Sequence, residues 1–203
     1  MSDIAEKLDL LLNLIEKCQP NIASLQPGLT RSAIAQKTAH LPFEFPEECQ
    51  LYMWHDGIGE ADYEHVDLEK TAPMIFRDHY LSNLDEALET YCDVREYLDS
   101  KDYEIIEWDT CFPFADLDGS YYFLVCGSHV LANRYQQPIV ELDRGINMMF
   151  HSFDSMLDTL IECYQQLDRR SYERYGILDR NHHIWAKHNP NIFAEMSLHQ
   201  YRL

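Results

Sequence analysis

The chain has 203 residues, of which 46% are hydrophobic, and this is enough to build one core without a disulfide or a metal. Its 35 Asp and Glu residues outnumber its 16 Lys and Arg residues, which gives a net charge of -19 with neutral histidines. We therefore expect no nucleic-acid ligand, because binding one depends on neutralising phosphates with a basic patch. No apolar run approaches about 18 residues and the first residues carry acids, so we expect neither a membrane span nor a signal peptide, but a cytoplasmic protein.

The charge is unevenly distributed along the chain. Residues 169–203 contain six Lys or Arg and three acids, whereas residues 1–168 contain ten Lys or Arg and 32 acids. A strongly acidic body with a mildly basic tail suggests a cationic partner.

The first third of the chain reads as a series of short helices. Apolar residues at helical spacing follow Ser2, which can cap a helix that Pro20 stops. Thr30 is placed to cap a second short helix through Ile34. Pro46 suits the first turn of a third helix.

The third helix ends in the sequence "YMWHDG". We predict that Gly57 has a positive φ and closes this helix, because glycine adopts the left-handed conformation without a Cβ clash. We expect Trp54 to lie against the sheet rather than to line a catalytic cleft. Residues 58–76 show no firm period and are interpreted as a loop with one or two short strands.

The middle of the chain changes from helix to strand. Ser82 and Asp85 resemble a capping box at the start of a helix that continues towards Leu98. Four short segments rich in aromatic and branched residues then predict an antiparallel meander, with a hairpin at Asp118-Gly119. The predicted strands are residues 103–108, 121–127, 138–142 and 147–151.

The clearest helical stripe of the chain follows Ser152, which can cap it, and ends near Gly176. Beyond Ile177 the pattern is weaker, with a helical segment expected after Asn189-Pro190. Helices, then strands, then a helix predict an α+β fold in a single domain. Its central antiparallel sheet is flanked by N-terminal helices and a long C-terminal helix.

Several motifs of the chain resemble sites of chemistry. The sequence "DLDG" at residues 116–119 begins like a calcium loop, but Tyr121 and Gly127 occupy the positions that need Gly and Glu, so a hairpin turn is favoured. Cys126, Ser128 and His129 are too close along one strand to converge as nucleophile and base. The six cysteines form no Cys-x-x-Cys pair and are interpreted as buried, reduced thiols.

A cluster of histidines near the C-terminus offers an alternative. His182, His183 and His188 are candidate zinc ligands, but their spacing is not i, i+4 and no nearby Cys pair completes a site. We therefore expect no metal, no cofactor and no catalytic residue, and keep a metal-dependent enzyme as the rival hypothesis.

A dense run of acids follows the third helix. It is either a solvated loop or a negative surface that steers a basic protein partner. The candidate partner-binding residues are Asp56, Glu60, Asp62, Glu64, Asp67 and Glu69.

Four stretches, in their order and spacing, resemble the SUKH superfamily, which includes fungal Smi/Knr cell-wall assembly regulators and many bacterial immunity proteins. They are "PGLT" at 27–30, "LPFEFPEECQLYMWHDG" at 41–57, "EWDTCFPFADLDGSYYFLVC" at 107–126 and "FHSFDSMLDTLIECYQ" at 150–165. The resemblance covers about residues 25–175 of one domain spanning 1–203, and leaves residues 177–203 as an extension.

The resemblance implies that Pro46, Trp54 and Gly57 shape the fold and that Trp108 and Gly119 belong to the central strands. It also implies a non-enzymatic protein that binds and occludes a partner, such as a toxin, or that acts as a regulatory factor. A housekeeping scaffold without a toxin partner is a third hypothesis.

Overall fold

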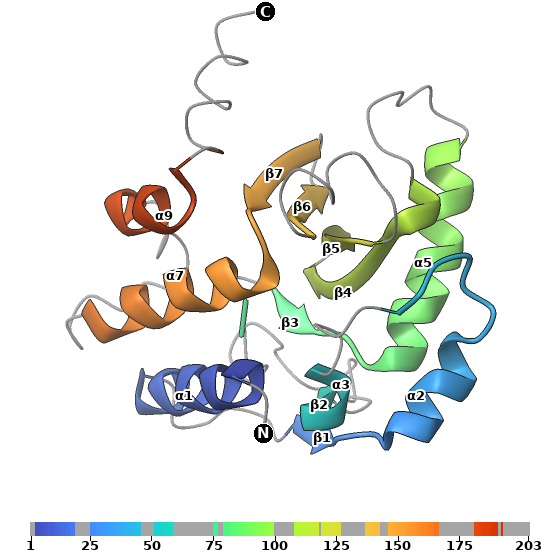
Figure 1. Cartoon of the computed structure of the whole chain (residues 1–203), viewed down its shortest axis with the longest axis horizontal. Helices are drawn as coiled ribbons and strands as arrows, with labels where there is room; N and C mark the ends of the chain where they lie inside the picture. The colour runs from blue at the N-terminus through green and yellow to red at the C-terminus, as the bar shows by residue number, and fades with distance from the viewer. Residues whose placement is uncertain are drawn as a thin grey trace, which may run out of the picture.

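A five-stranded antiparallel sheet lies at the centre of the fold in the computed structural model (Figure 1). Its strands follow chain order across the sheet: β3 (Tyr80–Leu81), β4 (Cys111–Leu117), β5 (Ser120–Val125), β6 (Ile139–Leu142) and β7 (Ile146–Phe150). The structure describes residues 3–18, 25–45, 51–58, 75–76, 79–99, 108–117, 119–126, 137–142, 146–166, 181–190 and 192. The predicted α+β class with a central antiparallel sheet is confirmed.

The predicted hairpin joins β4 to β5. Leu117 lies opposite Ser120 in the register, and Gly119 between them has a φ of +84°, a conformation that glycine adopts without strain. Gly119 therefore lies in the turn between two central strands rather than within one. Three of the predicted strands correspond to β5, β6 and β7.

The predicted strand over residues 103–108 is not confirmed. Residues 103–107 lie outside the described part of the chain, and Trp108 begins a 3-10 turn, η2 (Trp108–Thr110), so its placement in a central strand is wrong. The strand of this region is β4, which the sequence did not indicate because it contains Pro113. The pairing with β5 shifts register directly after Pro113, and such a bulge is where a central strand accommodates proline.

Two long helices lie side by side under the sheet: α1 (Asp3–Cys18) and α7 (Phe153–Gln166) (Figure 1). Ser152 caps α7 as predicted: its Oγ accepts from Ser155 N at 3.1 Å, and Ser155 Oγ accepts from Ser152 N at 3.0 Å. The predicted end of this helix near Gly176 lies outside the described residues.

The shorter helices also begin close to where their caps predict. Thr30 Oγ1 accepts from Ala33 N at 3.2 Å at the start of α2 (Arg31–Thr38). Helix α5 (Leu84–Asp99) is capped by Asn83 and Glu86, which exchange side-chain to backbone hydrogen bonds at 2.9 and 3.2 Å. The prediction of Ser82 as the cap is therefore wrong by one residue.

The segment before α5 contains a helix of one turn, α3 (Leu51–Trp54), which leads directly into strand β2 (His55–Ile58). Strand β2 pairs antiparallel with β1 (Leu25–Pro27) in a separate small sheet. Pro46 and the greater part of the predicted loop, residues 59–74, lie outside the described residues.

Side chains alternate between the two faces of the central sheet. Tyr122 and Leu124 join the main core with α1, α5 and α7, whereas Phe123 and Val125 belong to a second, smaller cluster with Cys111 and Val140. No helix among the described residues has the length and apolarity that a membrane crossing requires.

Candidate functional site

The acid at the start of the predicted acidic run has a role inside the fold. Asp56, on β2, is half-buried, and its Oδ1 accepts a hydrogen bond from Leu84 N at 2.8 Å, at the first turn of α5. It therefore satisfies one of the backbone N–H groups that a helix N-terminus leaves without a partner. The other five acids of the run, Glu60, Asp62, Glu64, Asp67 and Glu69, lie outside the described residues, so their role stays a prediction.

Burial is the main influence on the Asp56 carboxyl, and it raises its pKa because the charged form is poorly solvated. The hydrogen bond from Leu84 and the attraction of Lys37 lower the pKa, while repulsion by Asp85 adds to the increase, and the net direction is upward. Asp56 is thus a structural carboxylate whose ionised form is destabilised by burial.

Gly57 lies beside Asp56, against the same helix end. Its φ is +70°, so the predicted positive φ is confirmed. Its predicted role as a helix end is wrong, because α3 ends at Trp54 and Gly57 lies within β2. A Cβ on Gly57 would lie 2.3 Å from Asn83 N, so this position also requires glycine for the close approach of β2 to the cap of α5.

Trp54 packs against the main core, to which the central sheet contributes side chains. It is half-buried, its Nε1 donates to Asp9 Oδ1 on α1 at 2.6 Å, and its ring meets that of His55 edge-on at 4.4 Å. The indole therefore fastens α3 to α1, and its role is structural.

A hollow of about 270 Å³ lies between α5 and the edge of the sheet formed by β3 and β4. We name it the α5 groove. It is lined by Tyr80, Ser82, Glu86, Glu89, Thr90, Asp93 and Asp116. Four of these seven side chains are carboxylates, and the described residues that line it include no Lys or Arg.

Helical spacing explains one wall of the α5 groove. Glu86, Glu89 and Asp93 are three, four and seven residues apart and so lie on one face of α5. Asp116, on β4, forms the opposite wall, where its Oδ2 accepts a hydrogen bond from the Tyr80 hydroxyl at 3.0 Å.

Acids from both walls of the groove influence the pKa of one side chain, Tyr121. The pKa of Tyr121, on β5, is raised first by burial and then by repulsion from Asp116 and Asp93. Acids from a helix and from a strand thus converge on the same region.

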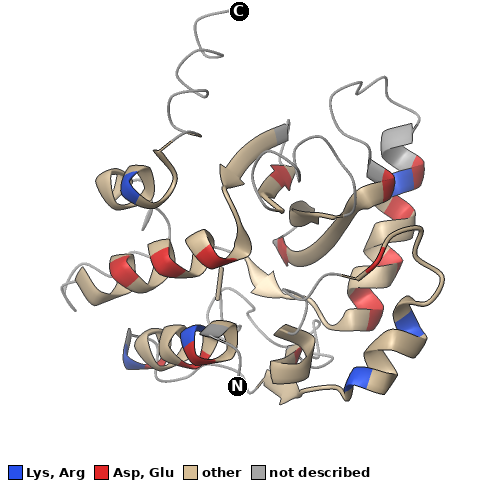
Figure 2. Cartoon of the chain, in the orientation of Figure 1, with Lys and Arg blue, Asp and Glu red and all other residues tan. Residues whose placement is uncertain are grey.

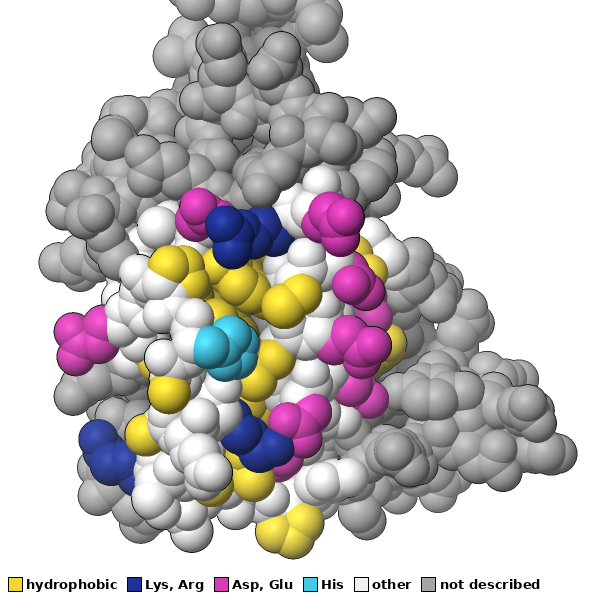
Figure 3. All heavy atoms as spheres, turned by 90° about the vertical axis from the view of Figure 1, so that its right-hand side faces the viewer, with side chains coloured by type: hydrophobic (Ala, Val, Ile, Leu, Met, Phe, Trp, Pro, Cys, Tyr) yellow, Lys and Arg dark blue, Asp and Glu magenta, His cyan; other side chains and the backbone are white. Residues whose placement is uncertain are grey.

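The surface around the groove is also acidic. Helix α5 carries six acids and one basic residue, Arg95, in its 16 residues, and Figure 2 shows the acids following one another along the helix. On the face of the molecule that carries α5 and α2, Figure 3 shows acidic side chains gathered along one side. Ion pairs occupy two other acids of this region, Asp85 with Lys37 and Asp109 with Arg95.

The C-terminal histidines do not converge. His182 and His183 are exposed on α9 (His182–His188), whereas His188 Nε2 lies 2.8 Å from Glu162 Oε2 on α7. Among the described residues, no three His, Cys, Asp or Glu side chains are grouped so that they could hold a metal ion. The geometry thus gives His188 a structural contact and does not favour the zinc hypothesis.

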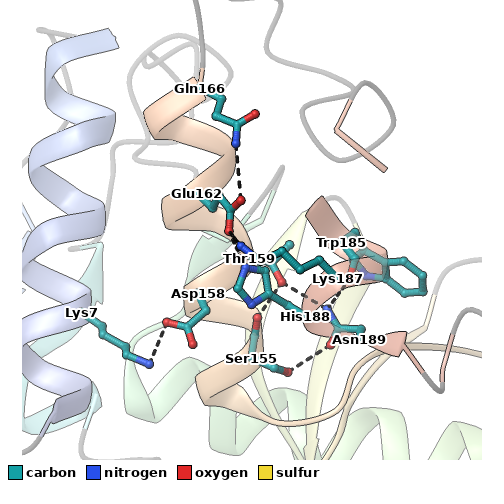
Figure 4. A network of polar contacts seen from close by, with 10 residues as sticks. All are labelled: Lys7, Ser155, Asp158, Thr159, Glu162, Gln166, Trp185, Lys187, His188 and Asn189. Carbon is teal, nitrogen blue, oxygen red and sulfur yellow. Dashed lines mark hydrogen bonds and ion pairs between the residues drawn. The ribbon is translucent and has the colours of Figure 1, made fainter. Parts of the chain in front are cut away.

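A polar network fastens α9 to α7 instead (Figure 4). Asn189 is fully buried: its Oδ1 accepts from His151 N at 3.0 Å and from Ser155 Oγ at 3.1 Å, and its Nδ2 donates to Thr159 Oγ1 and to Trp185 O, each at 3.1 Å. The hydrogen bonds from Lys187 and His188 lower the pKa of Glu162. Helix α9 lies before Asn189-Pro190, and the sequence did not predict it. The helix expected after this dipeptide is not tested, because residues 191 and 193–203 lie outside the described part of the chain.

Three of the described cysteines are buried. Cys111, Cys126 and Cys163 are buried, reduced thiols, as predicted, whereas Cys92 is a reduced thiol that is exposed. Burial, with the nearby Glu162, raises the pKa of Cys163 to about 12, so this thiol stays protonated at neutral pH. Ser128 and His129, the other members of the hydrolase candidate, lie outside the described residues.

Sequence reasoning missed the α5 groove. The acids at three, four and seven residues apart on α5 were visible as a pattern, but in so acidic a chain that pattern has little weight. In the sequence Asp116 is recognisable only as a turn residue, because its position opposite α5 depends on the sheet.

Comparison with known proteins adds no relative: the chain matches no protein-family model, and no curated protein is significantly similar to it.

Proposed function

We propose that this chain is a non-enzymatic binding module of the immunity or regulatory type that its resemblance to the SUKH superfamily implies. It recognises a basic protein partner and acts by occluding the partner's functional surface. The observation that carries the proposal is the α5 groove, where four carboxylates from a helix and a strand face one hollow.

Charge supports a protein partner with a positive surface. Glu89 and Asp93 form no ion pair with any described residue, so their negative charge is directed outward rather than used within the fold. Opposite charges on a partner accelerate encounter, and like charges reject unsuitable partners. The predicted acids between Glu60 and Glu69 follow β2 in the chain, and their part in partner binding stays a prediction.

The test uses the intact chain as bait to capture and identify a protein from source cells, followed by association kinetics with the purified partner. A Glu89→Gln/Asp93→Asn variant should associate roughly threefold or more slowly at low salt, and the difference should fade at about 1 M salt, where the Debye length is about 3 Å. A Glu6→Gln/Glu16→Gln variant makes the same change of charge on exposed positions of α1 and should bind as the wild type does.

A second variant tests the predicted loop. Replacing Glu60, Asp62, Glu64 and Asp67 with Asn or Gln should also slow association at low salt if the loop shares the partner surface. If both acidic variants associate at the wild-type rate in low salt, the proposed surface is wrong.

Co-expression distinguishes the immunity role from the regulatory one, because an immunity protein restores growth to cells that produce the captured partner.

A further inference from the structure

We propose that α9 is a displaceable cap on one edge of the central sheet, and that it keeps β7 from pairing with β7 of a second copy of this chain. Strand β7 ends the order of strands in the sheet, so one side of its backbone has no neighbouring strand among the described residues. An edge strand offers its N–H and C=O groups to any strand that approaches it. The inference goes beyond the proposed function, because the α5 groove lies at the opposite edge of the sheet, beside β3.

Two side chains from the end of α9 take the place of a further strand. The indole Nε1 of Trp185 donates to Met149 O at 2.8 Å, and Oδ1 of Asn189, the residue after α9, accepts from His151 N at 3.0 Å. Both side chains are buried, with 5% and 0% of their surface exposed. They therefore use backbone hydrogen bonds that a strand added to β7 would make, and hold them away from water.

The cap covers only the end of β7 that leads into α7. Met149 is the extra residue of a bulge, because Met148 lies opposite Val140 and Phe150 lies opposite Ile139. Bulges are one of the features that disfavour pairing at a sheet edge, and this one lies directly under Trp185. Ile146–Met148 form no hydrogen bond outside the pairing with β6 in the described part of the chain.

The composition of β7 favours a second copy as the strand that adds. Edge strands exclude other strands with charged side chains, above all Lys, or with Pro, and the sequence of β7, "INMMF", contains neither. Two β7 strands in an antiparallel arrangement would form a two-fold symmetric pair in which no like charges lie opposite each other. The rest of the chain, with a net charge of -19, opposes such a contact only at longer range. Protection of this edge therefore depends on α9.

The test releases the cap in the intact chain and follows self-association. Trp185→Ala should self-associate roughly tenfold or more tightly than the wild type in sedimentation velocity at about 0.15 M salt, where the Debye length is about 8 Å. Hydrogen exchange then identifies the interface: the amides of residues 146–150 should exchange more slowly as the concentration of Trp185→Ala rises. A helix that only supports the fold would instead give faster exchange at every concentration.

Three further variants separate the cap from general loosening of the fold. Trp54→Ala also removes an indole and its hydrogen bond, but from the contact between α3 and α1, and should not promote self-association. Asn147→Lys places a charge on β7 and, added to Trp185→Ala, should return self-association to the wild-type level. Trp185→Phe keeps an aromatic ring and removes only the donor to Met149, so it should self-associate roughly threefold more tightly than the wild type. If Trp185→Ala does not fold, Trp185→Phe decides.

The inference is overturned if the folded Trp185 variant self-associates no more tightly than the wild type. It is also overturned if Trp54→Ala self-associates as tightly, or if Asn147→Lys does not reverse the association, because surfaces other than β7 are then responsible. None of these results bears on the proposed function, which Glu89→Gln/Asp93→Asn tests separately.

Discussion

Two helices of this protein carry acids at the same spacing and use them differently. On α7 the acids are Asp154, Asp158 and Glu162, each four residues from the next. On α5 three of the six acids have the same spacing: Asp85, Glu89 and Asp93. All three on α7 are paired: Asp154 and Asp158 with Lys7 of α1 at 2.7 Å, and Glu162 with Lys187 at 2.6 Å. Of these three acids on α5, only Asp85 is in an ion pair within the described chain, with Lys37, whereas Glu89 and Asp93 line the groove.

The comparison shows that acid spacing alone does not distinguish a binding surface from a structural one. The α7 acids hold α1 and α9 against the helix that carries them, so their charge is used within the fold. Glu89 and Asp93 of α5 face a hollow, so their charge is available to a partner. Four predictions test this difference.

The largest effect is expected at the buried centre of the α7–α9 contact. Asn189→Ala should lower the free energy of unfolding by about 3 kcal/mol, because the His151 N–H and the Ser155 hydroxyl lose a buried acceptor and the Thr159 hydroxyl loses one of its two hydrogen bonds. Urea denaturation measures this loss. Asn147→Ala, at an exposed position of β7, is the control and should change the unfolding free energy by about 0.5 kcal/mol or less. Equal effects of the two substitutions would mean that the network does not fasten α9.

A smaller effect is expected where an acid caps α5. Asp56→Ala should cost about 1 kcal/mol, because Leu84 N loses its acceptor. Asp56→Asn keeps an acceptor oxygen and removes the charge that burial disfavours. Since the raised pKa of Asp56 means that its ionised form is destabilised in the fold, Asp56→Asn should match or exceed wild-type stability at pH 7 and lose this advantage at acidic pH. An equal loss for both variants at pH 7 would contradict the capping role.

The α7 acids also predict a pH dependence. The pKa of Glu162 is lowered in the fold, so its contribution to stability is fully present above its ordinary value of 4.5 and is lost as the pH falls through the lower folded value. Glu162→Gln should therefore be less stable than the wild type at pH 7, and the difference should shrink below about pH 4.5. Thermal melts from pH 3 to pH 7 measure it, with Glu6→Gln on α1 as the control. A difference that does not depend on pH would show that the charge of Glu162 is not what stabilises the contact.

The smallest effect compares the two helices directly. Asp154→Asn/Asp158→Asn should lower the unfolding free energy by about 0.5–1 kcal/mol, because Lys7 loses both of its partners. Glu89→Gln/Asp93→Asn should leave the free energy unchanged or raise it by a few tenths of a kcal/mol, because it removes repulsion between acids i and i+4. A clear loss of stability in the α5 variant would mean that these acids serve the fold, and would remove the basis for the groove as a binding site.

The sequence alone determined the features that depend on neighbouring residues. The helices behind Thr30 and Ser152, the strands β5 to β7 and the hairpin at Gly119 follow from caps, periodicity and turn chemistry, all of which act over a few residues. The positive φ of Gly57 was predicted for the same reason, although the glycine lies within β2 rather than at the helix end.

Only the tertiary structure decided which acids meet which partners. Asp56 bonds to a helix 28 residues away, and Asp116 reaches the acids of α5 through the pairing of β3 with β4. The sequence predicted a helix after Asn189-Pro190. In the structure Asn189 is the centre of a buried hydrogen-bond network that includes Ser155 and Thr159. The physical reason is that charge, burial and hydrogen bonding are properties of pairs, and the members of each pair lie far apart in the chain.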